Sequence, residues 1–430
     1  MSFRGKLWIM VLSGVVSAYA IVGGLPFVGG LLSTSAQQPV GDSTAQLRIV
    51  ESVLNHIQNE YVDEPNMEKV RLGALRGLAG GLDPYSSFLT AEQVKAFETN
   101  KTSNKVGIGA EFSQISGYLY VISAIKGSPA DKAGIKAGDF IEYIDTKATR
   151  DISLYDARQL VNGDVGTSIN LRVLRSGERP QTIKVVRGGY KVPTAESRIE
   201  SGKIGVVKVY SLEDGEAADI RASVQSLAKQ GVQKIVLDLR GVAAGSLQEG
   251  VSVANLFIRE GELAKVIARD NKVLTAYTAD ASKTIFDGKM AVLIDLGTAG
   301  AAEAVASAIL TSKRGEVIGE KSFGAGTEQK LFTLRSGEGL LLTVSKWASA
   351  GGTPFLGEER ATMGVKPSIE VKRPDTPEPL DVENLDGEQN EQNPQATPTP
   401  KPVQKQTEDL QLKRALEILA DKAAAAKVGV

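Results

Sequence analysis

Residues 290–310 read MAVLIDLGTAGAAEAVASAIL, an apolar run that passes through a glycine-containing turn into a second apolar stretch. The first part, Met290 to Leu296, has the length and composition of a buried strand. The second part, Ala301 to about Leu310, is alanine-rich and long enough for a helix. We therefore predict a strand, a tight turn and a helix at this point of the chain.

The same pattern occurs upstream and indicates the fold class. Residues 204–209 and 234–239 are strand-like runs, and the helical stretch 217–229 joins them. Such an order is typical of a βαβ unit in a parallel sheet. Residues 340–346 and 369–371 add two further strands. We predict a mixed α/β core that extends over residues 188–372.

A smaller domain precedes this core. From residue 106 to residue 187 the sequence changes to short strands of alternating polarity, separated by glycine-rich turns. The clearest of these strands are 119–122, 140–144 and 169–175. We predict a separate domain over residues 106–187.

Residues 42–105 form a helical region in this interpretation. Apolar residues recur there at spacings of three and four, which predicts one buried stripe on an amphipathic helix: Leu47, Val50, Leu54, Ile57 and Tyr61. A second helix is expected over residues 67–78, and the segment Asp83 to Leu89 is expected to turn at Pro84.

The C-terminal part of the chain has two sections. Residues 373–408 are dominated by Pro, Glu, Asn, Gln and Thr, which is typical of a solvated linker. Residues 409–430 contain a predicted helix over 410–425, with Leu412, Ala415, Leu416 and Leu419 at helical spacing. This helix is expected to dock on the body of the protein or on a partner.

The N-terminal segment, residues 1–41, predicts a membrane location. Arg4 and Lys6 precede an apolar stretch from Leu7 to Leu32, which at 26 residues is long enough to cross a bilayer. By the positive-inside rule this gives a single-pass anchor with a cytoplasmic N-terminus and an extracytoplasmic, periplasmic body. The second interpretation is a signal peptide that is cleaved after Ser33 to Ala36, giving a secreted form.

The composition excludes several classes of function. The chain of 430 residues has no Cys and one His, so thiolate nucleophiles, zinc fingers and iron–sulfur ligation are excluded. Its 50 basic and 51 acidic residues argue against a nucleic-acid partner, which requires clustered positive charge. We expect neither a metal nor a cofactor.

The 106–187 domain resembles a PDZ module. Gly107-Ile108-Gly109-Ala110 stands where such domains hold a peptide carboxylate, and residues 127–139, GSPADKAGIKAGD, match the connecting helix and turn. Consecutive free amides bind an anion, while an extended peptide adds to the edge of the sheet. The resemblance implies polypeptide C-termini as partners, although these glycines could instead serve only to make a turn.

From Leu47 to Val371 the chain resembles the C-terminal processing peptidases, also called tail-specific proteases. The matching motifs are Tyr61-Val62-Asp63-Glu64, Leu82-Asp83-Pro84 with Ser86-Ser87, Val236-Leu237-Asp238-Leu239-Arg240, Gly297-Thr298-Ala299, Glu303, and Gly319-Glu320-Lys321-Ser322-Phe323-Gly324 with Gly326 and Gln329. The resemblance implies a serine-protease-like core of the ClpP/crotonase type, with an inserted PDZ domain and a helical N-terminal cap.

Active members of that family use a serine nucleophile and a lysine base, and the motifs here lack both. The resemblance assigns the nucleophile position to Gly300 and the base position to Ala325. Gln329 stands where the family has the residue that orients the lysine. In addition, Gly241-Val242-Ala243-Ala244-Gly245 replaces the family's Asn-x-Pro-Gly-Gly turn. No catalytic residue is therefore expected.

Four other residues are possible replacements for the missing pair: Thr298, Ser307, Lys321 and Ser322. Lys321 is four residues from the base position, and Ser307 is about two helical turns beyond Gly300. The sequence thus predicts an inactive member of the family, a pseudoprotease that binds polypeptide C-termini as a scaffold or regulator. An active relative or other envelope proteins are the further partners considered. The alternative is an active serine-type endopeptidase with a displaced nucleophile.

Overall fold

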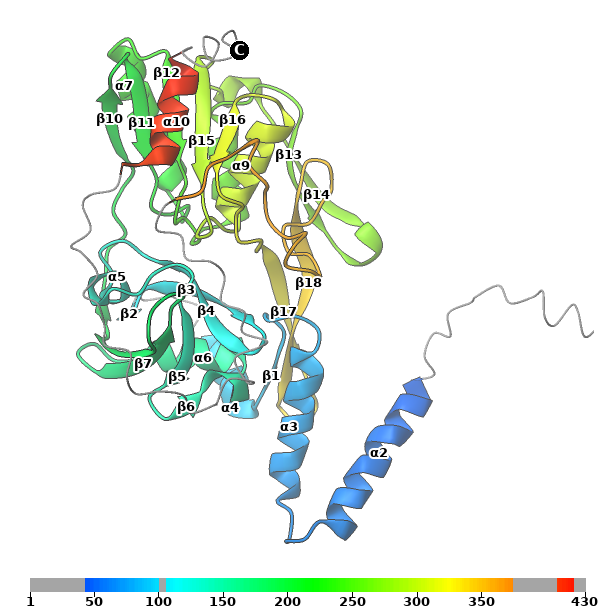
Figure 1. Ribbon diagram of the computed structural model, residues 1–430. Coiled ribbons are helices and arrows are strands. Elements are labelled where there is room, and N and C mark those ends of the chain that lie inside the picture. Colours follow the sequence, from blue (N-terminus) through cyan, green and yellow to red (C-terminus); the bar gives the residue numbers. More distant parts are fainter. Residues whose placement is uncertain (1–42, 100–105, 374–407, 421–430) are drawn as a thin grey trace, which may run out of the picture. The chain divides into compact units, whose positions relative to one another are not determined.

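The computed structural model describes residues 43–99, 106–373 and 408–420 (Figure 1). The chain divides into two compact units, one that ends at Ala74 and one that begins at Leu75. Within the first unit lie α2 (Ser43–Glu60) and the beginning of α3 (Met67–Gly80). The second unit contains every other element described below.

Helix α2 is present where it was expected, but the prediction of a buried stripe is wrong for its first half. Leu47 and Val50 are 67% and 40% exposed, while Leu54 and Ile57 are half-buried. Tyr61, which follows the helix, is 59% exposed, so the prediction is wrong for this residue as well. The spacing of apolar residues determines which face of a helix is apolar, but it does not supply the surface that covers this face. His56 is exposed on the same helix.

The core of the second unit is a six-stranded sheet in the order β10-β11-β12-β15-β16-β19. Its strands are β10 (Glu196–Glu200), β11 (Ile204–Lys208), β12 (Lys234–Asp238), β15 (Lys289–Ile294), β16 (Glu316–Gly319) and β19 (Ile369–Glu370). β10 is antiparallel to β11, and all other neighbours are parallel. The α/β core predicted from the repeated strand–helix pattern is therefore confirmed.

Helices cover both faces of this sheet, because successive side chains of each strand point to opposite faces. On β15, Met290, Val292 and Ile294 pack with α7 (Glu216–Lys229), α8 (Leu247–Asn255) and α9 (Ala301–Thr311). Ala291 and Leu293 pack instead with α10 (Leu410–Leu419), which lies against β12, β15 and β16 (Figure 1). The C-terminal helix thus docks on the body, one of the two outcomes expected for it.

In a second sheet the strands are linked in the order β1-β18-β13-β14, and β17 also pairs with β18. β1 and β13 pair with the two ends of β18, and β17 pairs along most of its length. Its strands are β1 (Ser87–Leu89), β13 (Glu262–Ile267), β14 (Val273–Thr278), β17 (Thr327–Thr333) and β18 (Gly339–Ser349). Asp83 accepts hydrogen bonds from the N–H groups of Tyr85 and Ser86 at 2.8 and 3.0 Å, which makes the turn predicted before β1. Helix α4 (Ala91–Thr99) follows β1.

Residues 106–189 form a third sheet with its own apolar core. Its strands are β3 (Ala110–Ile115), β4 (Tyr118–Ala124), β5 (Phe140–Ile144), β7 (Ser168–Leu174) and β8 (Gln181–Val186), in that order. β6 (Lys147–Ala148) pairs antiparallel with the end of β5, and β2 (Val106–Gly107) pairs with β9 (Gly188–Gly189). α5 (Pro129–Ala133) and α6 (Leu154–Val161) complete the domain. Ile108, Phe112, Ile141 and Leu171 are fully buried in its core.

The prediction of a single-pass membrane anchor needs correction. Among the described ranges 43–99, 106–373 and 408–420, no helix has both the length and the apolar character needed to cross a bilayer. The 18-residue helix α2 is long enough, but it carries Arg48, Glu51 and Glu60 and is apolar on one face only. The predicted anchor, residues 1–41, lies outside the described residues.

Two helical glycines provide a test of the packing between α8 and α9. A Cβ on Gly250 in α8 would lie 2.6 Å from the carbonyl oxygen of Ala301, whereas a Cβ on Gly77 in α3 would meet nothing within 4 Å. We expect Gly250→Ala to lower the free energy of unfolding by about 1–3 kcal/mol. Gly77→Ala is expected to raise it by up to about 1 kcal/mol, because alanine favours the helix. Urea unfolding measures both, and equal effects of the two substitutions would contradict the close helix contact.

Candidate functional site

Gly300, the predicted nucleophile position, is the N-cap residue of α9. It is buried, and its φ of 58° and ψ of −113° lie in a region that residues other than glycine rarely adopt. A Cβ on Gly300 would come no closer than 3.4 Å to another group, the Cζ3 atom of Trp347. The site therefore has room for a small side chain, at a backbone strain of about 1–3 kcal/mol.

The carboxylate of Glu303 joins this helix start to the segment 322–325. Its Oε2 accepts hydrogen bonds from the N–H groups of Gly300 and Ala325, both at 2.8 Å. Its Oε1 accepts from the N–H of Gly324 at 2.7 Å and from the hydroxyl of Ser322. Burial raises the pKa of Glu303 to about 7, although these four hydrogen bonds act in the opposite direction.

Ala325, the predicted base position, carries no group that can transfer a proton. Its side chain is half-buried and packs in an apolar cluster that includes Ala243, Ala299 and Phe323. Ala325 is one of the two positions whose N–H groups bind Glu303, and Ala299 directly precedes the other, Gly300. The cluster around the predicted base position is thus apolar, and Ala243 and Ala299 in it are small.

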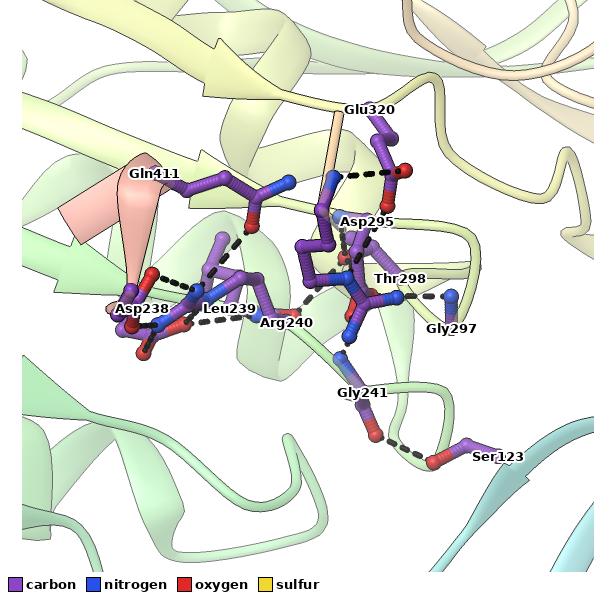
Figure 2. A network of polar contacts seen from close by, with 12 residues as sticks. Ser123, Asp238, Leu239, Arg240, Gly241, Asp295, Gly297, Thr298, Glu320 and Gln411 are labelled. Atoms are coloured by element: carbon purple, nitrogen blue, oxygen red, sulfur yellow. Dashed lines mark hydrogen bonds and ion pairs between the residues drawn. The ribbon is translucent and has the colours of Figure 1, made fainter. Parts of the chain in front are cut away.

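Strand β4 of the 106–187 domain covers the same cluster. The ring of Tyr120 stacks on that of Phe323, with centroids 5.3 Å apart and an interplanar angle of 22°. The guanidinium of Arg360 lies 4.2 Å from the centroid of Phe323 and 5.8 Å from that of Tyr120. The hydroxyl of Ser123 donates to the carbonyl oxygen of Gly241 at 2.6 Å (Figure 2). This domain therefore contacts the segments that carry the predicted site.

The turn 241–245 is held by its own backbone contacts. The carbonyl oxygen of Val242 accepts the N–H of Ala299 at 2.9 Å, and the N–H of Gly241 donates to Oδ1 of Asp295 at 2.9 Å. Gly245 pairs with Leu212, and a Cβ on Gly245 would lie 2.3 Å from the Leu212 carbonyl oxygen. Since the N–H groups of Gly241 and Ala299 are both bonded within the chain, neither is available to an oxyanion.

Acidic residues follow three neighbouring parallel strands at the edge where open α/β sheets commonly bind ligands. Asp238 ends β12, Asp295 follows β15 and Glu320 follows β16, and Figure 2 shows their contacts with basic groups. Asp238 is bound by Arg240 at 2.8 Å, whereas Arg373 lies 3.3 Å from Asp295 and 3.2 Å from Glu320. Within the described residues, no group of three or more acidic, His or Cys side chains is suited to a metal ion.

Gln329 belongs to a polar network. Its Nε2 donates to the hydroxyls of Thr327 at 2.7 Å and Thr343 at 3.3 Å. Thr343 in turn donates to Asp83 at 3.0 Å. Gln329 therefore helps to connect β17 and β18 to the turn before β1.

The four residues considered as replacements form no nucleophile–base pair. Thr298 donates to the carbonyl oxygen of Leu239 at 3.0 Å, and Ser322 is buried between Glu303 and the N–H of Val365. The Nζ of Lys321 donates to the carbonyl oxygens of Arg360 and Ala361 at 2.9 and 2.6 Å. Ser307 is buried within α9. No hydrogen bond joins the lysine to any of the three hydroxyls in the described part of the chain.

The predicted peptide loop, Gly107 to Ala110, leads into the edge strand β3. Ile108 is buried in the domain core, and the carbonyl oxygen of Gly109 accepts hydrogen bonds from Ile125 and Ser128. A Cβ on Gly109, whose φ is 72°, would lie 2.4 Å from Cβ of Ser128. Gly109 is thus required by the fold of the loop, so a bulky residue there would disturb more than peptide binding.

The open edge of β3 is contacted by Arg158 from α6. Phe112 on β3 lies opposite Val121 on β4, and the N–H and C=O groups of Val121 bond to Asp139 and Gly138 on the side of β5. Phe112 and Val121 are therefore a non-hydrogen-bonded pair, and the carbonyl of Phe112 points away from β4 to the open edge. The guanidinium of Arg158 donates to this carbonyl oxygen at 3.1 Å and lies 3.8 Å from the carboxylate of Glu111. Arg158 therefore occupies a hydrogen-bonding position that a peptide strand would use.

Comparison with known proteins connects these features to two families. Residues 203–371 match the model of peptidase family S41, and residues 120–175 match that of the PDZ domain. The chain is 30% identical over 371 residues to the carboxy-terminal processing protease CtpA of Bacillus subtilis (strain 168), covering 86% of this chain and 78% of the relative. It is also 30% identical to a probable CtpA-like serine protease of Staphylococcus haemolyticus (strain JCSC1435), covering 74% of that relative.

A solved structure shows the same fold. The photosystem II D1 C-terminal processing protease superposes with a TM-score of 0.63 at 26% identity, over 76% of this chain and 93% of that one. Together with the PDZ match, this similarity confirms the fold class predicted from the motifs.

The role of Glu303 can be tested by Glu303→Gln, which we expect to lower the free energy of unfolding by about 2 kcal/mol. The reason is that an amide NH2 cannot accept the hydrogen bonds that Glu303 accepts. The folded pKa of about 7 lies above the roughly 4.3 of an unfolded glutamate. The proton on Glu303 therefore favours folding below about pH 4, and this contribution is lost as the pH rises through about 7.

Urea unfolding between pH 4 and 8 measures this effect. The stability difference between parent and variant is expected to shrink with rising pH. Glu98→Gln, at an exposed position of α4, is the control and should leave the free energy of unfolding unchanged. A difference that grows with pH would contradict the raised pKa of Glu303.

Proposed function

Because this chain belongs to peptidase family S41, the family of the carboxy-terminal processing proteases, we propose that it is an inactive member that binds polypeptide C-termini as a scaffold or regulator. One observation carries the proposal. The two backbone positions that Glu303 holds together, Gly300 and Ala325, bear a hydrogen and a methyl group, neither of which can attack a peptide bond or accept a proton.

The hydroxyls and the amine near these positions support the same conclusion. Thr298 and Ser322 are buried and make hydrogen bonds inside the fold, and Lys321 is bonded to two backbone carbonyls. A nucleophile needs both a neighbouring base and access to the substrate. Ser322 has a carboxylate neighbour in Glu303, but its hydroxyl is buried and also accepts the N–H of Val365. An active endopeptidase with a displaced nucleophile would require these contacts to be broken and rearranged.

The proposed binding function rests on the PDZ domain. We propose that an extended peptide pairs with its edge strand β3 and that the loop 107–110 holds the terminal carboxylate. The apolar cluster around Tyr120 and Phe323 connects this domain to the start of α9 and the segment 322–325, which are together called the cleft below. Binding of a tail to the PDZ domain is therefore proposed to alter the cleft, and an active relative in the same cell is the partner that such a regulator would serve.

The absence of catalysis is tested with the purified full chain on an unfolded polypeptide with an apolar C-terminus. We expect no detectable cleavage, because loss of the nucleophile and base lowers kcat by a factor on the order of 10⁶. Thr298→Val and Ser322→Ala serve as controls, and Gly300→Ser/Ala325→Lys tests whether the missing groups suffice. Cleavage by the unaltered chain that is abolished in Ser322→Ala or Thr298→Val would refute the proposal.

Peptide binding is tested separately by titrating an apolar peptide with a free carboxylate against its C-terminally amidated form. Only the free acid is expected to bind. Arg158→Ala should tighten binding roughly three- to tenfold, because one hydrogen bond of about 1 kcal/mol to Phe112 no longer competes with the peptide. Arg172→Ala, which removes an exposed guanidinium on β7, is the matched control. Equal affinity for acid and amide would show that the loop 107–110 does not bind a carboxylate.

A further inference from the structure

The C-terminal helix α10 completes the core by covering one face of its sheet. Ala415 and Leu419 are buried against Val206, Val236 and Leu293, and half-buried Leu412 and Leu416 flank them. In the described part of the chain, α10 is the only helix in this apolar cluster. Its removal would expose the apolar side chains of four parallel strands to water.

A buried glutamine links α10 to two parts of the core. Gln411 has no exposed surface, although glutamine is seldom fully buried. Its Nε2 donates to the carbonyl oxygen of Val371 at 2.8 Å, and its Oε1 accepts from Arg240 at 3.1 Å. The position and direction of α10 on the sheet are therefore specified by hydrogen bonds as well as by apolar contact.

Asp409 adds a charged contact at the N-terminus of the helix. It accepts the N–H of Leu412 at 3.0 Å and so caps α10, and its two oxygens each accept from Arg240 at 2.9 Å. The same guanidinium also binds Asp238, at 2.9 and 2.8 Å. Arg240 is thus shared between the carboxyl end of β12 and the beginning of α10, as Figure 2 shows for Asp238 and Gln411.

Arg240 is followed directly by the turn of the candidate site. Gly241 donates its N–H to Asp295, and its carbonyl oxygen accepts the hydroxyl of Ser123 from the PDZ domain. The Arg240 carbonyl oxygen accepts from Nζ of Lys208 at 2.6 Å. Side chain and backbone of Arg240 are therefore both held, and the neighbouring residue is where the PDZ domain meets the core.

We propose that the docking of α10 on the sheet face beside Arg240 orders the turn 241–245 and thereby the contact of the PDZ domain with the segments that carry Gly300 and Ala325. The occupant is the chain's own segment 409–420, an amphipathic helix with an aspartate cap and a buried glutamine two residues later. This inference concerns the regulation of the site around Gly300 and Ala325, and it holds whether or not that site is catalytic.

The test compares two charge reversals in the same helix of the full chain by hydrogen–deuterium exchange. Asp409→Lys places a cation beside Arg240, whereas Glu417→Lys changes a 40% exposed side chain that pairs with Arg414 on the same helix. In Asp409→Lys we expect the exchange of α10 amides to rise roughly tenfold or more, and that of segments 239–246 and 120–124 to rise with it. Glu417→Lys should leave all three segments unchanged.

A synthetic peptide of residues 408–420 distinguishes undocking from general misfolding. Added to Asp409→Lys, it should restore slow exchange in 239–246 and 120–124, because it reoccupies the vacated surface. If Asp409→Lys does not fold, Asp409→Asn is used with the same readouts. The proposal is overturned if α10 exchanges rapidly while 239–246 stays protected, if α10 stays protected in both Asp409 variants, or if the peptide restores nothing. None of these readouts depends on cleavage or on tail binding.

Discussion

The carboxylate of Glu303 is the interaction on which the arrangement of the cleft depends. It is fully buried, and its four hydrogen bonds join the N-terminus of α9 to the segment 322–325, although these elements lie on separate parts of the chain. An unpaired charge at this depth would be strongly unfavourable, so the surrounding N–H groups must converge on it. Because Glu303 binds backbone N–H groups, this arrangement does not depend on the side chain at position 325, whereas at position 300 the φ of 58° favours glycine.

The side chains at these positions affect a different property, the contact with the PDZ domain. Ala243, Ala299 and Ala325 are small and apolar, and they pack with Phe323 below Tyr120, Ile122 and Phe140 of the PDZ sheet. A lysine at position 325 would have to place its amine in or beside this apolar cluster. In our proposal the substitutions that remove the chemistry also make the cleft a better surface for the PDZ domain, which suits a protein that works by contact.

The regular elements that could be predicted from the sequence are those with strong periodicity or long apolar runs. β5, α7 and α9 lie within two residues of their predicted limits. Helix α8 was not predicted, since Gly250 interrupts its pattern, yet that glycine permits the close approach to Ala301. β13, β14 and β17 were also not predicted, although β13 pairs with β14 and β17 with β18 as neighbours in sequence. β14 and β17 are mostly exposed and therefore lack a long apolar run.

The residues that organise the site were harder to predict than those that were expected to react. The motif comparison singled out Gly300, Ala325 and Gln329, but the convergence on Glu303 involves contacts across about 20 residues and could not be read from spacing. The shared use of Arg240 by Asp238 and Asp409 spans 169 residues. The Asp-Leu-Arg sequence indicated the contact between Arg240 and Asp238, whereas nothing in the sequence indicated the contact between Arg240 and Asp409.

Trp347 gives the cleft an optical property. The chain has two tryptophans, Trp8 and Trp347, and the ring of Trp347 lies over the backbone of both Gly300 and Gly326. It is half-buried, so its emission responds to changes in the polarity and water content of its surroundings. With Trp8 replaced by phenylalanine, the intrinsic fluorescence of the full chain would come from one indole at the start of α9, and the state of the cleft could be followed in real time without a label.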